Sequence, residues 1–266
     1  MLNNPSYQPL KDPPRLQNPP ITVTPIYGIP RVRKGEDLSY LIISAMNKSG
    51  LELQDGDVVV ITQKAISKAE GMAIDLTEVM PGSKARRLAR SIGKDPRVVE
   101  LILREAKRVV RLGHGVIITE TRHGFVCANS GVDQSNVEEG YATTLPLDPD
   151  SSARKIRRKL EAKTRKRVAV VITDTFGRPW REGQVDVAIG CSGIRPLISL
   201  KGTLDPYGYR LKVTEPAVVD EIAAASELVM RKLEMVPAAL VRGARYERGE
   251  TGIGSLIRQR KLDLFR

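Results

Sequence analysis

Two acidic segments of the sequence combine the residue types that bind a divalent cation. Residues 129–136 carry Asp133, and residues 173–178 carry Asp174 beside Thr175. We expect each segment to form a turn at the end of a strand, the second directly after an apolar run. Carboxylate and hydroxyl oxygens are the ligands that Mg²⁺ and Mn²⁺ prefer, and these ions usually bring a phosphate with them. In a strongly basic chain, the two segments together predict nucleotide-dependent chemistry.

Neighbouring side chains favour this interpretation over a plain structural one, in which each Asp serves only its own turn. The Thr175 hydroxyl is suited to complete a metal shell, and Asn136 offers an amide to phosphate or sugar oxygens. Lys64 and Lys68 lie four residues apart after a buried strand. They either begin a solvated helix or reach a phosphate, and the sequence alone leaves both interpretations open.

A stiff loop follows the second acidic segment and contains two arginines. Arg178 and Arg181 flank Pro179 and Trp180. Arginine binds carboxylates and phosphates in a bidentate manner, so these two are candidate substrate-binding residues. Trp180 is the only tryptophan of the chain, and we expect it to lie in the core.

Other kinds of site are excluded or disfavoured by spacing. The two cysteines have no paired spacing, and His114 and His123 have no metal-ligand spacing. The glycines of 249–254 lack the strand–loop–helix context of a dinucleotide loop. Nine Lys or Arg lie within 154–167, which suggests nucleic acid but is more typical of a solvated helix face. Aromatic residues make up only 4% of the chain, too few for single-strand stacking platforms.

The elements that must position these residues alternate between strand and helix. Expected strands cover 21–24, 58–61, 116–118, 168–173 and 239–241. Expected helices cover 36–50, 83–92, 97–107, 151–164 and 216–233, with Ser151 or Ser152 capping the fourth. The alternation predicts an α/β or mixed α+β fold. Residues 1–20 contain six prolines and are expected to form a flexible tail before a domain at 21–266.

Bulk composition restricts the partners and the location. The net charge of +12 favours nucleic acid, a membrane surface or a polyanionic small molecule. No apolar run is long enough to span a membrane, and the N-terminus lacks a secretion signal, so we expect a cytoplasmic protein.

At this point the motifs resemble one family. Residues 66–71, 131–136 and 172–175 are together highly specific for the coenzyme F420-0:L-glutamate ligases, and the similarity extends from about residue 23 to residue 243. The resemblance implies an unusual α/β fold built as an intertwined homodimer, with two interleaved subdomains as one organisation of residues 21–266.

The resemblance also implies a reaction and its residues. GTP would phosphorylate the terminal carboxylate of F420-0, and the amine of L-glutamate would displace the phosphate, with further γ-linked glutamates as an extension. Asp133, Asp174 and Thr175 would hold Mg²⁺ or Mn²⁺, with K⁺ as a further candidate ion. Asp133, Asp174 and Arg178 would form the catalytic set. The nucleotide would contact Tyr27, Gly28, Ile29, Pro30, Gln63, Lys64, Lys68 and Asn136.

The sequence departs from the family pattern at 230–237, where the glycines are absent and Lys232 stands near the position of an acidic residue. The number of metal ions and the choice of nucleotide are left open by this departure. Two alternatives remain beside the leading hypothesis. One is a divergent relative that joins an amino acid to another acid or uses another nucleotide. The other is a non-catalytic basic module that binds nucleic acid, which salt-sensitive binding without divalent-ion dependence would reveal.

Overall fold

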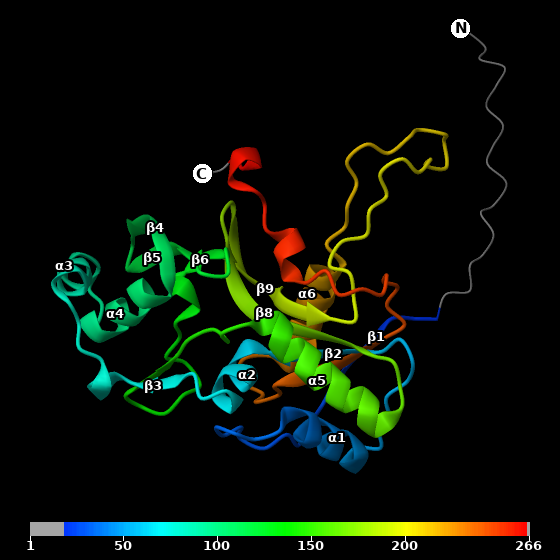
Figure 1. Ribbon diagram of the computed structural model, residues 1–266, viewed down its shortest axis with the longest axis horizontal. Helices are drawn as coiled ribbons and strands as arrows, with labels where there is room; N and C mark the ends of the chain where they lie inside the picture. The colour runs from blue at the N-terminus through cyan, green and yellow to red at the C-terminus, as the bar shows by residue number, and fades with distance from the viewer. Residues whose placement is uncertain (1–18, 265–266) are drawn as a thin grey trace, which may run out of the picture.

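The computed structural model describes residues 19–264, so most of the predicted tail at 1–20 lies outside the described residues. Figure 1 shows a larger lobe around one sheet and a smaller lobe beside it. Each lobe has its own hydrophobic cluster. The mixed α/β architecture agrees with the fold class predicted from the sequence.

A five-stranded sheet in the order β1-β10-β2-β8-β9 forms the larger lobe. Its strands are β1 (Thr22–Pro25), β2 (Val58–Thr62), β8 (Ala169–Arg178), β9 (Arg181–Ser192) and β10 (Ala238–Arg242). β2 and β8 are parallel, whereas β10 lies antiparallel between β1 and β2. Strands β1, β2 and β8 therefore all run in one direction. The apolar runs of the three central strands are buried because helices cover both faces of the sheet.

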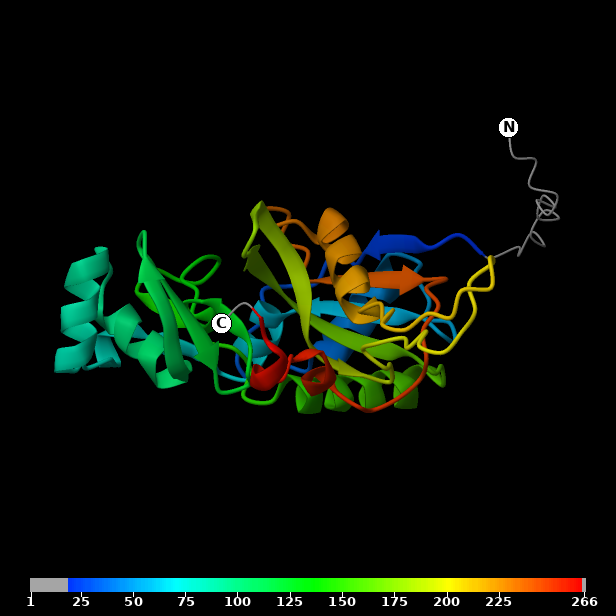
Figure 2. The same cartoon turned by 90° about the horizontal axis from the view of Figure 1, so that it is seen from above.

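Helices α5 and α6 lie on opposite faces of this sheet (Figure 2). The helices of the larger lobe are α1 (Leu38–Lys48), α2 (Gln63–Ala69), α5 (Pro149–Thr164) and α6 (Val218–Met230). Asp37 caps α1 by accepting a hydrogen bond from the Ser39 amide, as the acidic start of this segment predicts. The prediction that Ser151 or Ser152 caps α5 is wrong, because Asp148 accepts the hydrogen bond from the Ser151 amide.

Residues 73–143 form the smaller lobe, which is inserted between α2 and α5. Strands β3 and β7 pair where the chain leaves the larger lobe and returns to it. The elements of the insertion are β3 (Ala73–Asp75), α3 (Ser83–Ile92), α4 (Pro96–Glu105), β4 (Ala106–Gly113), β5 (Val116–Thr121), β6 (Val126–Ala128) and β7 (Tyr141–Thr143). The predicted helix at 97–107 ends at Glu105, because the chain turns there into β4, which pairs with β5.

The second acidic segment is part of a strand, and its prediction as a turn is wrong. β8 continues through Asp174 to Arg178 because every residue from Thr173 to Gly177 pairs with β9. The tight turn lies at residues 179 and 180, and Trp180 is 75% exposed there, so its predicted place in the core is also wrong. The polar composition of 173–178 suits one strand of a projecting hairpin, whose outer part has little core to cover.

A β-bulge lies beside Asp174 in this hairpin. Ile172 pairs with Gly190 and Thr173 pairs with Ala188, so Ile189 has no partner on β8. The displaced Ala188 amide donates a hydrogen bond of 2.9 Å to the Asp220 carboxylate on α6. Bulges of this kind redirect side chains and occur often beside active sites.

Two further segments leave the sheet. Residues 200–214 form a long arm that projects from the larger lobe (Figure 1). The C-terminal segment crosses β9 through the 3₁₀-helix Ile253–Leu256 and brings Ile257 against Gly124 of the smaller lobe. The Ile253 amide donates a hydrogen bond to Asp150 at the start of α5, which holds this segment in place. None of the helices among the described residues has the length and hydrophobicity needed to cross a membrane.

Candidate functional site

One edge of the central sheet gathers most of the residues singled out in the sequence. β1, β2 and β8 run in the same direction, so the segments that follow Pro25 and Thr62 lie at the edge where Asp174 stands. The loop containing Lys232 enters β10 at this edge as well, since β10 runs the opposite way. The carboxyl ends of parallel strands are the usual ligand-binding edge of such sheets. The sheet topology therefore places Tyr27–Pro30, α2 and Asp174 at one common edge.

The smaller lobe contributes the first acidic segment to this edge. The Asp133 backbone pairs with Thr143, with the Asp133 amide donating to the Thr143 carbonyl at 3.0 Å and the Thr143 amide donating back at 2.8 Å. The Asp133 carboxylate accepts from the Ser135 amide at 2.7 Å and the Ser135 hydroxyl at 3.0 Å. These bonds fix both the backbone and the side chain of Asp133, in a turn that follows β6 as predicted.

Lys64 connects the two lobes at Asp133. Its ammonium lies 2.8 Å from the Asp133 carboxylate and 3.0 Å from the Ser135 carbonyl oxygen. Burial acts to raise the pKa of Asp133, but the Lys64 ammonium and the Ser135 hydrogen bonds outweigh it and hold the pKa below its usual value. Asp133 therefore remains ionised around neutral pH.

Lys68 stands one helical turn farther along α2 and lies among other cations. Its ammonium donates a hydrogen bond of 2.6 Å to the Asn136 carbonyl oxygen. Burial lowers the pKa of Lys68, and the positive charges of Lys64 and Arg31 lower it further. Three cations that repel one another beside an open edge form a site that an anion stabilises, such as the phosphates of a nucleotide.

Asp174 has the opposite electrostatic environment. No ion pair among the residues 19–264 involves its carboxylate. Burial raises the pKa of Asp174 to about 7, and the negative charges of Asp186 and Asp133 contribute to the rise. The Thr175 amide and the Lys64 ammonium offset this only in part. Asp133 and Asp174 are thus close enough to repel each other, and a cation between them would relieve that repulsion.

Asp186 on β9 is a site residue that the sequence analysis missed. It is 2% exposed and accepts hydrogen bonds from the Thr173 hydroxyl at 2.9 Å and the Thr175 hydroxyl at 2.6 Å. Its charge also raises the pKa of Glu227 on α6, after the larger effect of burial. The sequence carries no direct signal for Asp186, because its place beside Asp174 depends on the antiparallel register that pairs Asp186 with Thr175.

The predicted metal ligands differ in where they face. Successive side chains of a strand point to opposite faces, and regular pairing holds from Thr173 to Gly177. The Asp174 carboxylate therefore faces away from the hydroxyls of Thr173 and Thr175. The assignments of Asp133, Asp174 and Thr175 as metal ligands all stay predictions, and among these three residues the charge of Asp133 acts on Asp174.

This donor set fits a hard divalent cation such as Mg²⁺ or Mn²⁺. The carboxyl oxygens of Asp133 and Asp174 repel each other, and Asp174 has no cationic partner at hydrogen-bond distance among the described residues. Within the same part of the chain, no group of three or more His, Cys, Asp or Glu side chains is arranged to hold a metal ion. A divalent ion here would take two carboxylates from the protein and further ligands from phosphate and water, as Mg²⁺ commonly does.

The remaining nucleotide-site candidates occupy the rim of this edge. Gln63 is 1% exposed, and its amide nitrogen has no hydrogen-bond partner among the described residues. Asn136 donates from its side-chain amide to the Lys232 carbonyl oxygen at 3.3 Å, which brings the loop before β10 to the first acidic segment. Tyr27 and Pro30 are exposed at the same edge, where Gly28 adopts a left-handed conformation with φ of +84°.

Arg178 is the candidate that the fold does not bring to this edge. It lies near the hairpin tip, where its guanidinium donates to the Glu182 carbonyl oxygen across the turn. It lies four residues along the strand from Asp174, a span of about 13 Å. A catalytic role for Arg178 remains a prediction that the contacts of the described residues do not support.

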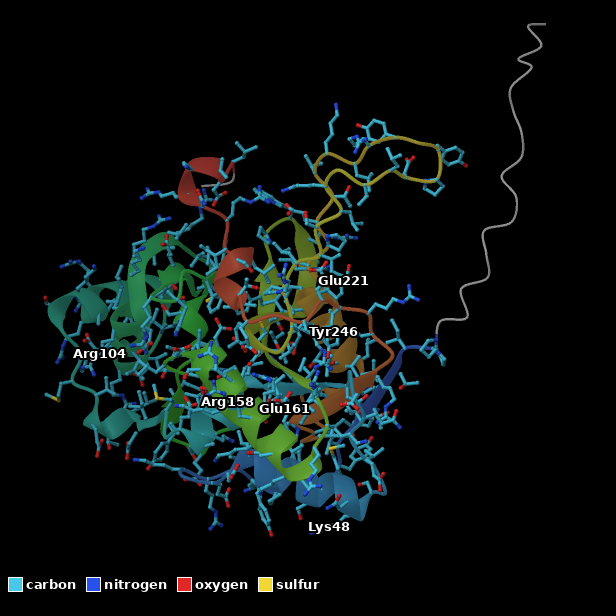
Figure 3. All side chains as sticks on the ribbon, turned by 45° about the vertical axis from the view of Figure 1, so that its right-hand side comes forward. Lys48, Arg104, Arg158, Glu161, Glu221 and Tyr246 are labelled. Carbon is cyan, nitrogen blue, oxygen red and sulfur yellow. The ribbon has the colours of Figure 1, made fainter. Side chains whose placement is uncertain are left out.

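The basic run at 154–167 forms a helix face held by ion pairs. It belongs mostly to α5, from which Arg158 and Glu161 project (Figure 3). Arg157 pairs with Glu161 at 2.8 Å and with Glu250 at 2.9 Å, and Lys159 pairs with Asp37 at 3.1 Å. These contacts agree with the interpretation of a helix face and give no support to a nucleic-acid surface there.

Comparison with known proteins gives one consistent result. The family model of the F420-0:gamma-glutamyl ligases matches residues 28–243. The coenzyme F420:L-glutamate ligase of Methanothermobacter thermautotrophicus is 49% identical over 249 residues, which cover 92% of this chain and 99% of that protein. The protein of the same name from Methanopyrus kandleri is 47% identical over 253 residues, or 93% of this chain and 98% of that protein. The Archaeoglobus fulgidus protein of this name is 40% identical over 247 residues, covering 92% and 96%. The chain therefore belongs to the F420-0:gamma-glutamyl ligase family.

Proposed function

We propose that this protein joins L-glutamate to the carboxylate of coenzyme F420-0 in a reaction driven by GTP and a divalent cation. One observation carries the proposal: a pair of mutually repelling carboxylates, Asp133 and Asp174, stands beside a group of mutually repelling cations that includes Lys64 and Lys68. A divalent cation satisfies the first group and a polyphosphate satisfies the second. The relatives named coenzyme F420:L-glutamate ligase support this choice of substrates.

Chemically, the first barrier is the poor electrophilicity of a carboxylate. Transfer of the γ-phosphoryl group of GTP to a carboxylate oxygen of F420-0 forms an acyl phosphate and releases GDP. The glutamate amine then attacks the acyl carbon, phosphate leaves with the C–O bonding electrons, and the amine loses a proton. The acceptor carboxylate is itself the nucleophile of the first step, so the protein needs to supply positioning and charge rather than a covalent intermediate.

The residues have separate tasks in this scheme. Lys64 and Lys68 bind phosphate oxygens and reduce the repulsion between two anionic substrates. Asp133 and Asp174 would hold Mg²⁺ or Mn²⁺, which when bound neutralises charge on the transferring phosphoryl group. Lys64 lies between the two groups, because it contacts Asp133 and also contributes to the cationic side. K⁺ remains a prediction of the sequence, and no contact of the described residues supports it.

The direct test is product mass after incubation with F420-0, L-glutamate, GTP and Mn²⁺. The proposal expects a product heavier by one glutamyl residue, and further additions would show extension of the γ-linked chain. Asp174→Asn should abolish metal-dependent turnover, while Glu221→Gln, at an exposed carboxylate of α6, should retain it. The absence of any glutamyl product with the unchanged protein would refute the proposal.

Assays with alternative substrates distinguish this proposed activity from that of a divergent relative. The loop at 230–237 is a reason to test the nucleotide, because it brings the positive charge of Lys232 near Glu227, where it offsets part of the rise in the pKa of Glu227 that burial and Asp186 cause. Replacing GTP with ATP, and F420-0 with other carboxylic acids, should reduce turnover. Faster turnover with another acid or nucleotide would identify the divergent activity instead.

We further propose that the protein is a homodimer whose contact includes the projecting arm. Apolar and aromatic side chains of this arm are exposed: Leu204 by 60%, Tyr207 by 82%, Tyr209 by 58% and Val213 by 82%. Such a concentration of exposed apolar side chains is typical of an interaction surface. Light scattering should give twice the chain mass of 29.3 kDa, and the double variant Tyr207→Ser/Val213→Ser should shift the protein toward monomer. A monomer at micromolar concentration would contradict this proposal.

A further inference from the structure

Asp186 holds the two threonines that flank Asp174. One carboxylate oxygen accepts from the Thr173 hydroxyl at 2.9 Å, and the other accepts from the Thr175 hydroxyl at 2.6 Å. Thr173 and Thr175 share one face of β8, so Asp174 between them points to the other face. The contact therefore connects β9 to both neighbours of Asp174, and the direction of the Asp174 side chain matters for the site.

The burial of the Asp186 carboxylate would be energetically unfavourable if this contact served only to stabilise the fold. Asp186 is 2% exposed, and no ion pair among the described residues neutralises it. A buried carboxylate without a cation is unfavourable, and a neutral amide or hydroxyl could also bond to two threonines. The charge of Asp186 moreover acts against the ionisation of its neighbours Asp174 and Glu227.

The local backbone explains why such a contact is needed. The bulge at Ile189 interrupts the ladder immediately before Thr173, and the hairpin beyond it projects from the sheet. A bulge increases the local twist and leaves one residue unpaired, so the ladder alone holds this part of β8 less firmly. Two side-chain hydrogen bonds that span Asp174 restrict the rotation of its backbone.

We propose that Asp186 is a positioning residue for the candidate site: by holding Thr173 and Thr175, it fixes the direction in which the Asp174 carboxylate faces Asp133. This inference rests on the proposed function, since it concerns the pair of carboxylates that would hold the divalent cation. Residues that orient metal ligands from behind typically change metal affinity by 10- to 100-fold when they are removed.

Thr173 provides the decisive variant, because it changes no charge and points away from the Asp174 carboxylate. Thr173→Val keeps the side-chain shape and removes the hydroxyl, while Thr173→Ser keeps the hydroxyl. The measurement is the Kd for Mn²⁺ alone, without nucleotide or acceptor, by electron paramagnetic resonance of free Mn²⁺ and by calorimetry. We expect Thr173→Val to weaken Mn²⁺ binding about tenfold and Thr173→Ser to stay within about twofold of the unchanged protein.

A double-variant cycle links this effect to Asp186. In the Asp186→Ala background the Thr173 hydroxyl has already lost its partner, so Thr173→Val should weaken Mn²⁺ binding by less than about twofold there. Ser226→Ala is the matched control, because it removes another buried hydroxyl, which donates to the Ile222 carbonyl oxygen within α6. That variant should reduce thermal stability and leave the Kd for Mn²⁺ unchanged.

Each outcome decides the inference. Unchanged Mn²⁺ affinity in Thr173→Val overturns it, and so does equal weakening by Thr173→Val with and without Asp186. If Asp186→Ala fails to fold, the comparison of Thr173→Val with Thr173→Ser decides alone. An unchanged protein that binds no Mn²⁺ would overturn the metal site of the proposed function and this inference together, whereas Mn²⁺ binding that is insensitive to Thr173 overturns only the inference.

Discussion

Replacing Asp174 with Asn should stabilise the metal-free protein at alkaline pH and not at acidic pH. In the fold, burial and the charges of Asp186 and Asp133 raise the pKa of Asp174 from 3.8 to about 7. A carboxyl group whose pKa is raised on folding favours the folded state while it is protonated. Its contribution is fully present below the unfolded pKa of 3.8 and is lost as the pH rises through about 7.

The magnitude follows from the size of the shift. Each unit of pKa corresponds to about 1.4 kcal/mol, so a shift of roughly three units makes the ionisation of Asp174 cost about 4 kcal/mol of folding free energy at most. Because the site is partly open to water, we expect about 2 to 4 kcal/mol. Asn cannot ionise, so Asp174→Asn avoids this cost. The variant should be more stable than the unchanged protein by this amount at pH 8, and the difference should vanish near pH 4.

The assay is urea unfolding in the presence of a chelator at several pH values between 4 and 8. The relevant quantity is the difference in unfolding free energy between variant and unchanged protein, since the pH dependence of groups that do not interact with Asp174 cancels in it. Glu221→Gln is the control for replacing an exposed carboxylate outside the site by an amide. A flat difference for Asp174→Asn would refute the electrostatic account of this site, and Mn²⁺ at pH 8 should remove the advantage of the variant by stabilising only the unchanged protein.

Three other predictions concern the same electrostatics and the fold that supports it. Mn²⁺ affinity should fall about tenfold from pH 8 to pH 6, because Asp174 with a pKa of about 7 goes from roughly nine-tenths to roughly one-tenth ionised; calorimetry that shows constant affinity would contradict this. Lys64→Met should weaken GTP binding at least about tenfold, since it removes a cation from the phosphate side and the partner of Asp133; nucleotide titration of the folded variant checks it, and unchanged affinity excludes Lys64 from the site. Arg242→Met should lower the unfolding free energy by about 3 kcal/mol without changing Mn²⁺ affinity, because Asp57, which is 1% exposed, loses the guanidinium 2.8 Å away; urea unfolding with an unchanged midpoint would contradict this.

The sequence predicted the strands whose two faces are both buried. Continuous runs of Val, Ile, Leu and Ala begin β8 and make up most of β2 and β10, and these runs stand out from the polar turns around them. β9 was missed because it begins with the polar residues Arg-Glu-Gly-Gln, and only its later part, from Val187 to Cys191, is apolar. The same cause led to the wrong prediction that β8 ends before Asp174. A strand of a projecting hairpin is stabilised by backbone pairing, so its side chains give little indication that the segment is a strand.

The residues of the candidate site stand out in the sequence where their types are chemically distinctive. Asp133, Asp174, Lys64 and Lys68 stand out because acidic and basic side chains follow apolar strands, and the fold brings them to one edge of the sheet. Asp186 was not predictable, since its relation to Asp174 depends on a register and a bulge that the sequence does not reveal. Arg178 was selected because it is close to Asp174 in the sequence. The two residues lie far apart in space because the chain between them is an extended strand.

The electrostatics of these residues favours the proposed binding site over an internal ion-pair network. A network designed only for stability would place the cations of α2 against the carboxylates of β8 and β9, yet no ion pair among the described residues joins them, and Lys64 pairs instead with Asp133 of the smaller lobe. Burial and then the nearby cations lower the pKa of Lys68, and burial and then the nearby carboxylates raise the pKa of Asp174. The fold therefore disfavours the charged form of both groups, and an ion of opposite sign from solution stabilises that charged form. Because the two groups are adjacent, the ligand that relieves both at once is a cation bound to a polyanion, and this condition is met by a nucleotide triphosphate with its divalent ion.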